Sequence, residues 1–140
     1  MKTIEKKVNR AEQRILKLKN LARKFNSFEE YVASRDNMDI AERNIQVAIE
    51  ACLDIGKIII ANQGLAEPED NKGIFSVLAE AGIISKESLS FLMPMAGTRN
   101  ILVHGYDRID DALIYGIMKK HLNNFEDFLN QVRDYARSSG

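Results

Sequence analysis

The most informative stretch of this sequence is residues 95–106, which read Met95-Ala96-Gly97-Thr98-Arg99-Asn100-Ile101-Leu102-Val103-His104-Gly105-Tyr106. An arginine, an amide, a histidine and a tyrosine are distributed through an apolar segment with helical spacing. The chain has only two histidines, and His104 is one of them. No other part of the sequence brings a base, a fixed positive charge and a phenol so close together, so this stretch is the candidate functional site.

On a regular helix Arg99 and Tyr106 share one face, while Asn100 and His104 share another. Arg99 and His104 are then about 140° apart around the helix axis and do not face one small ligand together. Two arrangements solve this problem. Either Gly105 ends the helix and turns His104 back, or a second copy of the chain completes the site.

These residue types suit cleavage of RNA through its 2′-hydroxyl. Such a reaction needs a base for the hydroxyl, an acid for the leaving oxygen and a cation for the transition state. The other histidine, His121, falls on the apolar stripe of the last expected helix, where a structural role is expected. A symmetric dimer would supply two copies of His104 and of Arg99 in one cleft. The alternative from residue types alone is that Arg99 and His104 cap the helix end and bind a carboxylate such as Asp107.

Apolar residues at alternating spacings of four and three predict a helix from Ile4 to Phe25. A polar pause at Asp36–Asp39 precedes a long predicted helix that ends near Asn62, and a final helix is expected from about Ile114. No segment shows the sustained alternation of apolar and polar residues that is typical of a strand. We therefore expect an all-α fold, an antiparallel up-and-down bundle of four main helices plus one or two short ones, in a single domain of residues 1–140.

The composition is that of a soluble globular domain, with 45% hydrophobic and 29% charged residues. No apolar run approaches the roughly 20 residues that a membrane span needs, and no secretory signal is recognisable, so a cytoplasmic location is expected. The one cysteine, Cys52, is expected to be buried and inert. The acidic loop Glu67–Asp70 lacks the spacing of a calcium site, and we expect no metal and no cofactor.

The formal net charge of zero conceals an uneven distribution. Residues 1–24 contain nine Lys/Arg against two Glu, a net of +7, so the remaining residues carry −7. A basic helix on an acidic body suits contact with nucleic acid or an acidic partner. A solvated face beside the acidic surface of the same protein is the slightly preferred interpretation.

The pattern Arg99-Asn100-x-x-x-His104-x-Tyr106, preceded by Met95-x-Gly97, resembles the signature of the HEPN superfamily, and most of all its HepT-like branch. The predicted long helix, with Glu42-Arg43-x-x-x-x-Ala48-x-Glu50-Ala51-x-x-Asp54-Ile55, is similar to the second main helix of that branch. The resemblance covers about residues 1–137. Only the long basic first helix is atypical.

The resemblance implies a homodimeric ribonuclease toxin that works without a metal. Arg99 and His104 would be catalytic, and Asn100 would orient them or the phosphate. The implied partner is a minimal nucleotidyltransferase antitoxin that attaches AMP to Tyr106, the residue that also contacts RNA. The alternatives are a non-catalytic nucleotide- or RNA-binding HEPN module that partners a nucleotidyltransferase, and a helical dimer without a small-molecule role.

Overall fold

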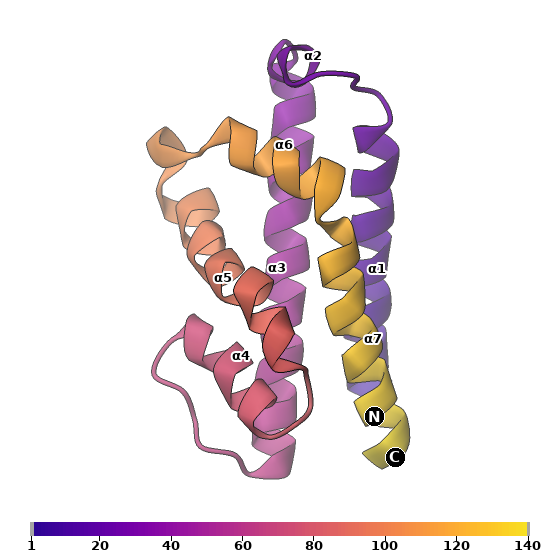
Figure 1. Cartoon of the computed structure of the whole chain (residues 1–140), viewed down its shortest axis with the longest axis vertical. Helices are drawn as coiled ribbons and strands as arrows, with labels where there is room; N and C mark the ends of the chain where they lie inside the picture. Colours follow the sequence, from indigo (N-terminus) through magenta and orange to yellow (C-terminus); the bar gives the residue numbers. More distant parts are fainter. Residues whose placement is uncertain (1, 140) are drawn as a thin grey trace.

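The protein, for which we describe a computed structural model of residues 2–139, is helical in all of its regular structure within that range (Figure 1). Four helices are long: α1 (Lys2–Ala22), α3 (Arg35–Gln63), α5 (Leu89–His104) and α7 (Leu122–Ser139). The shorter elements are α2 (Phe28–Val32), α4 (Asn71–Glu80), α6 (Asp111–Lys120) and the 3₁₀ turns η1 (Lys86–Ser88) and η2 (Tyr106–Arg108). The all-α class is confirmed. Residues 1 and 140 of the expected single domain lie outside the described range.

The two longest helices, α1 and α3, run antiparallel and pack along much of their length (Figure 1). Helix α7 packs against α1, while α4 and α5 pack against each other and against α3. Helix α6 crosses the end of the bundle that is farther from the two termini. Because α5 rises toward that end, its last residue, His104, is directed away from the start of α1 and the end of α7.

The apolar stripes expected from the sequence form the core. In α1, Ile4, Val8, Ala11, Ile15 and Leu18 are each at most 2% exposed, so this stripe is the inner face of the helix. The buried apolar side chains of the helices form one continuous cluster. Within residues 2–139 no helix has both the length and the apolar character that a membrane crossing requires.

The long helix α3 begins earlier than the sequence suggested. The Ser34 hydroxyl caps it by accepting a 3.2 Å hydrogen bond from the backbone N–H three residues on, and the helix starts at Arg35. The polar pause predicted at Asp36–Asp39 is therefore wrong, because these residues form the first turn of α3. The opposite end is as expected, since Gly64 adopts the left-handed conformation (φ 62°) that stops the helix.

The single final helix predicted from about residue 114 is also wrong, because the chain breaks at His121 into α6 and α7. The ammonium of Lys119 explains the direction of α6. It donates hydrogen bonds to the backbone oxygens of Ala22 (2.9 Å) and Phe25 (2.7 Å), where α1 ends and its carbonyl groups lack helical partners. The end of α6 is thereby tied to the end of α1, and α7 turns to run along α1.

The basic helix α1 forms ion pairs with the acidic remainder of the protein. Lys19 lies 2.7 Å from a carboxylate oxygen of Glu126 in α7, and Lys7 lies 3.8 Å from Asp54 in α3. These pairs support the preferred interpretation of a solvated face beside an acidic surface. The outward side of α1 still carries exposed cations, Lys6, Arg10 and Lys17.

Candidate functional site

Helix α5 positions three of the four predicted site residues. Its inner face, with Leu92, Met95, Ala96 and Leu102, is buried in the core and fixes the rotation of the helix. Pro94 lies inside the helix, as the sequence indicated, and the Thr98 hydroxyl donates a 3.2 Å hydrogen bond to its carbonyl oxygen. The faces that remain carry Arg99, half-buried, and Asn100 and His104, exposed.

Arg99 is held by a carboxylate from another helix. Its Nε donates a 3.1 Å hydrogen bond to Oε2 of Glu50 in α3, and its Nη2 lies 3.1 Å from the same oxygen. Both side chains are about a third exposed or less, at 28% and 31%. The partial burial strengthens the pairing and fixes the direction of the guanidinium.

Two amides extend this pair into a polar cluster. Nη1 of Arg99 donates to Oδ1 of Asn100 at 3.4 Å, and the Gln46 amide donates to Oε2 of Glu50, also at 3.4 Å. Asn100 therefore contacts Arg99 directly, and the orienting role expected of it stays a prediction. We name Gln46, Glu50, Arg99 and Asn100 the Arg99 cluster.

His104 is the last residue of α5, and Gly105 ends the helix. The Gly105 amide donates a 2.8 Å hydrogen bond to the Ile101 carbonyl, after which its backbone (φ −127°, ψ 49°) leaves the helical region. Gly105 therefore ends the helix, as the first arrangement left open by the sequence requires, but His104 still belongs to α5, so the chain turns only after the histidine. Within residues 2–139 no hydrogen bond joins the exposed imidazole of His104 to Arg99 or Asn100.

Tyr106 does not share a helical face with Arg99, because α5 has already ended; that expectation is wrong. The tyrosine begins the η2 turn and its side chain is 73% exposed. A tyrosine so exposed contributes little to the core. Its hydroxyl is accessible to a modifying enzyme, and its ring is free to stack on a ligand.

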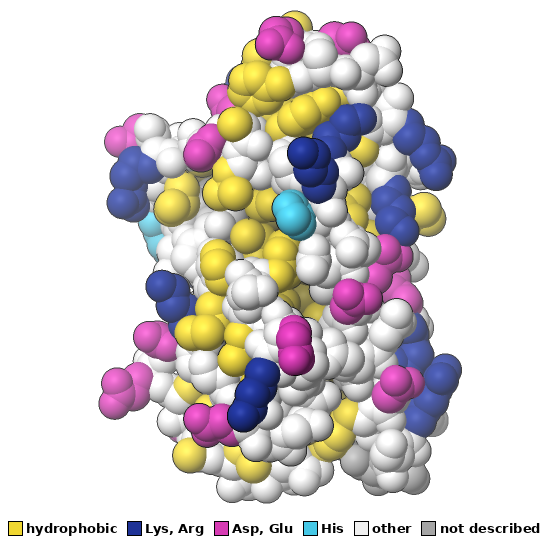
Figure 2. All heavy atoms as spheres, in the orientation of Figure 1, with side chains coloured by type: hydrophobic (Ala, Val, Ile, Leu, Met, Phe, Trp, Pro, Cys, Tyr) yellow, Lys and Arg dark blue, Asp and Glu magenta, His cyan; other side chains and the backbone are white. Residues whose placement is uncertain are grey.

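His121 lies apart from the motif. It caps α6, is exposed rather than buried in an apolar stripe, and its Nδ1 lies 3.2 Å from Oδ1 of Asn124. Its ring centroid is 6.0 Å from that of Phe91. Figure 2 shows the two histidine side chains well separated on the surface. The expectation that His121 lies on a buried apolar stripe is therefore wrong; its contacts are with Asn124 of α7 and Phe91 of α5.

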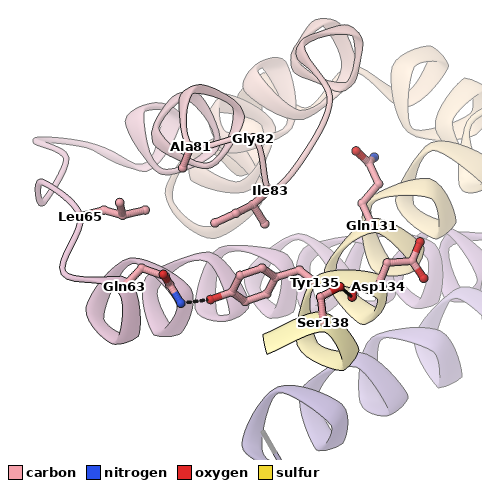
Figure 3. A pocket seen from close by; sticks show the side chains of 9 residues that line it. All are labelled: Gln63, Leu65, Ala81, Gly82, Ile83, Gln131, Asp134, Tyr135 and Ser138. Carbon is pink, nitrogen blue, oxygen red and sulfur yellow. Dashed lines mark hydrogen bonds between the residues drawn. The ribbon is translucent and has the colours of Figure 1, made fainter. Parts of the chain in front are cut away.

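Two hollows of the surface are not lined by Arg99, Asn100, His104 or Tyr106, although Met95 lines the second of them. A cavity of about 690 Å³ between the ends of α3, α4 and α7 contains the hydrogen bond from Gln63 to Tyr135 (Figure 3). A smaller hollow of about 300 Å³ between α5 and α6 is lined by apolar side chains such as Phe91 and Leu113 and lies on the face shown in Figure 2. Among the described residues there is no group of three or more His, Cys, Asp or Glu side chains arranged to hold a metal ion.

Two residues of this region were not identified from the sequence as site residues. Glu50 belongs to the helix pattern quoted for the family resemblance, but nothing in a single sequence pairs it with Arg99. Arg108 lies on η2, and its guanidinium folds back over Gly105, as described below. Its only signal in the sequence is its closeness to Tyr106.

Comparisons with known proteins identify the family. Residues 11–132 match the family model described as Ribonuclease HepT-like. The chain is 32% identical to an mRNA nuclease HepT of Shewanella oneidensis over 90 residues, which is 64% of this chain and 68% of the relative. It is 28% identical to a tRNA nuclease HepT of Aphanizomenon flos-aquae over 109 residues, 78% of this chain and 74% of the relative.

Solved structures show the same fold. A toxin–antitoxin crystal structure with AMP-PNP superimposes with a TM-score of 0.87 at 24% identity, covering 96% of this chain and 99% of that one. A tri-AMPylated HEPN toxin of Shewanella oneidensis, in complex with its MNT antitoxin, superimposes with a TM-score of 0.84 at 25% identity. That match covers 94% of this chain and 96% of the other.

Proposed function

The chain belongs to the HepT-like ribonuclease family, and from this premise we propose that it is a metal-independent endoribonuclease toxin whose reaction is carried out by Arg99 and His104. The observation that carries the proposal is the placement of the motif. Arg99 is anchored by Glu50, and an exposed His104 follows five residues later at the end of the same helix. Both groups are at the surface, where a long RNA chain has access.

In the proposed reaction the 2′-oxygen of a ribose attacks the adjacent phosphorus, and a histidine accepts the proton of that hydroxyl. The bond from phosphorus to the 5′-oxygen breaks, and an acid donates a proton to the leaving oxygen. The products are a 2′,3′-cyclic phosphate and a free 5′-hydroxyl. Arg99 stabilises the negative charge of the five-coordinate phosphorus, and Asn100 orients the guanidinium.

A homodimer would complete this chemistry. The reaction needs both a base and an acid, whereas one protomer supplies one histidine at the motif, since His121 lies elsewhere on the surface. Two protomers that meet at the ends of their α5 helices would bring two copies of His104 into one cleft. The cleft would also cover an otherwise exposed site.

The proposed antitoxin is a minimal nucleotidyltransferase that modifies Tyr106. The phenol oxygen would attack the α-phosphorus of ATP, pyrophosphate would leave, and the phenolic proton would pass to a base of the transferase. Tyr106, 73% exposed on a turn, is accessible for this transfer. The added AMP brings bulk and negative charge beside His104 and would exclude an RNA phosphate.

A cytoplasmic location stays a prediction.

Cleavage of RNA by the purified protein in the presence of EDTA tests the activity. We expect cyclic-phosphate ends from the wild type, and a loss of cleavage of at least about a hundredfold in His104→Ala and in Arg99→Ala. His121→Ala is the matched control, because it removes the other histidine, and it should cleave normally. Unmodified wild-type protein that leaves RNA intact would refute the nuclease proposal.

Modification is tested with the partner transferase and ATP. Intact mass should increase by AMP units in the wild type and remain unchanged in Tyr106→Phe, whereas the control Tyr135→Phe should be modified as the wild type is. Mass gain in Tyr106→Phe would assign the modification to another residue.

A non-catalytic nucleotide- or RNA-binding module is the second candidate. The exposed ring of Tyr106 favours it, because such a ring can stack on a base without any bond being cleaved. Calorimetric binding of AMP or RNA with equal affinity by wild type and His104→Ala, together with no cleavage by either, would favour this module over the nuclease.

A further inference from the structure

The positive charge of Arg99 is largely compensated inside the protein. Two of its nitrogens, Nε and Nη2, are directed at Glu50, and the third, Nη1, donates to Asn100. A phosphate that approaches Arg99 competes with a carboxylate already in place. Binding of a phosphodiester at this end of α5 therefore calls for a further cation whose donors are not already in use.

Arg108 has this property. It is exposed, and within residues 2–139 its guanidinium makes no hydrogen bond and no ion pair, although three carboxylates lie within three residues of it in the chain. One of them, Asp110, is instead used to cap α6 by accepting a 3.1 Å hydrogen bond from the backbone N–H of Leu113. The N–H donors of Arg108 are left open to solvent.

The guanidinium of Arg108 lies over the end of α5. A Cβ built on Gly105 would lie 2.9 Å from Nη2 and 3.1 Å from Nε of Arg108, so the guanidinium rests against the glycine where no side chain intervenes. The backbone of the turn is fixed by a 2.7 Å hydrogen bond from the Arg108 amide to the Gly105 carbonyl. Gly105 is buried and sits between His104 and Tyr106, so the guanidinium of Arg108 lies at the motif.

We propose that Arg108 is a second phosphate-binding cation of this site, and that it binds a phosphodiester of the RNA beside His104; the inference rests on the proposed function. An exposed guanidinium with open donors fits a phosphodiester, because it can present paired N–H groups to two phosphate oxygens.

The same chemistry extends to regulation. An adenylate on Tyr106 is joined through a phosphodiester with one negative charge, as is each link of RNA. Tyr106 and Arg108 belong to the same 3₁₀ turn, and the adenylate phosphate is placed to take the guanidinium that the RNA would use. The adenylate therefore inhibits in two ways. It excludes RNA by its bulk and charge, and its phosphate binds Arg108 in place of the RNA phosphate.

Binding of a short 2′-O-methyl RNA, which lacks the attacking hydroxyl and is not cleaved, tests the inference. Arg108→Ala should weaken binding about tenfold and reduce the slope of log affinity against log salt by about one, with an unchanged melting temperature. Arg108→Lys should recover part of the affinity. Gly105→Ala should weaken binding less than Arg108→Ala does, because its Cβ moves the guanidinium aside without removing the charge. Arg137→Ala, which removes an exposed arginine from the far end of α7, is the control and should change neither quantity.

Cleavage of ordinary RNA by the same wild-type preparation separates the two hypotheses. If the wild type does not cleave, the proposed function fails. If it cleaves, and Arg108→Ala binds the 2′-O-methyl RNA with the affinity and salt dependence of the wild type, then only the role of Arg108 is overturned. For the adenylate, the ³¹P resonance of modified Tyr106 should shift in Arg108→Ala, and an unchanged resonance would overturn its contact with Arg108.

Discussion

Glu50 in α3 and Arg99 in α5, 49 residues apart in the chain, meet through a two-nitrogen contact in which Nε and Nη2 both lie 3.1 Å from Oε2. The contact joins the longest helix of the bundle to the helix that carries the motif. The carboxylate fixes the guanidinium, but its negative charge also offsets part of the positive charge of Arg99. The carboxylate therefore has two opposing effects on RNA, better positioning and weaker attraction.

Glu50→Gln separates these effects, because it keeps the shape of the side chain and removes its charge. We expect cleavage to slow by about tenfold to a hundredfold as Arg99 loses its anchor, while RNA binding is equal or tighter. The free energy of unfolding should change by less than about 1 kcal/mol, since the pair is partly exposed. Single-turnover rates and affinities for a 2′-O-methyl RNA measure both effects.

Glu42→Gln is the matched control for this substitution. Glu42 also lies in α3 and pairs with an arginine, Arg35, at 2.7 Å, but it is not part of the Arg99 cluster. Its substitution should leave cleavage unchanged. A Glu50→Gln variant that cleaves RNA at the wild-type rate would show that Glu50 does not position Arg99 for the reaction.

Cys52 should make stability depend on pH in the alkaline range. Burial raises the pKa of its thiol to about 12, whereas an exposed cysteine titrates at about 8.5. The unfolded chain therefore releases a proton that the folded chain retains. The contribution of this group is full below about pH 8.5, and above that the free energy of unfolding falls by about 1.4 kcal/mol per pH unit until the folded thiol itself ionises.

Urea denaturation between about pH 8 and about pH 10 measures this slope. Cys52→Ala leaves a small cavity and lowers stability throughout, but its pH dependence should be flatter than that of the wild type. Parallel profiles for the two proteins would contradict the prediction.

Tyr31→Phe should leave the protein as stable as the wild type or stabilise it by up to about 1 kcal/mol. The Tyr31 side chain is fully buried, and its hydroxyl has no hydrogen-bond partner within the described part of the chain. Removing an unsatisfied hydroxyl removes its desolvation cost. The ring itself packs on Phe25 and Tyr115, with centroids 5.5 and 5.4 Å away, so Tyr31→Ala should cost about 3–5 kcal/mol. Chemical denaturation measures the free energy of unfolding of both variants. A marked loss of stability in Tyr31→Phe would mean that the Tyr31 hydroxyl is hydrogen-bonded in solution.

Gly56→Ala should destabilise the contact between α3 and α4. An added Cβ would overlap Cγ2 of Ile74 and lie 3.3 Å from Cδ1 of Leu78, so α4 would have to move, at about 1–3 kcal/mol. Gly116→Ala in α6 is the control, because nothing lies within 4 Å of its added Cβ. There the better helix propensity of alanine should add about 0.5–1 kcal/mol. Thermal denaturation should show a lower melting temperature for Gly56→Ala and a higher one for Gly116→Ala. Equal shifts in melting temperature would contradict this packing.

Much of the fold was predictable because the information is local. The stripe from Ile4 to Leu18 determined the inner face of α1, and Gly64, with φ of 62°, ends α3 close to Asn62, where the sequence placed the end of that helix. The start of α3 was misplaced because a cap, Ser34, outweighed the polar residues after it. The break at His121 has no glycine or proline to announce it, since it depends on Lys119 reaching the end of α1.

The residues of the site could likewise be predicted from local sequence, whereas their partners could not. Arg99, Asn100, His104 and Tyr106 were singled out by their residue types, their spacing and the resemblance to the HepT-like motif, and the structure places the first three on one helix. What the sequence does not contain is the partner of each charge. Glu50 reaches Arg99 only because α3 and α5 pack together, and Arg108 lies over Gly105 only because the chain turns there.

The start of α1 and the end of α7 lie at one end of the bundle, away from the end of α5 (Figure 1). A fluorophore, an affinity handle or a surface linker attached at either terminus would thus leave His104 and Tyr106 unobstructed. Immobilised molecules would present the motif outward, and energy transfer between labels on two chains would report how a pair of them is oriented.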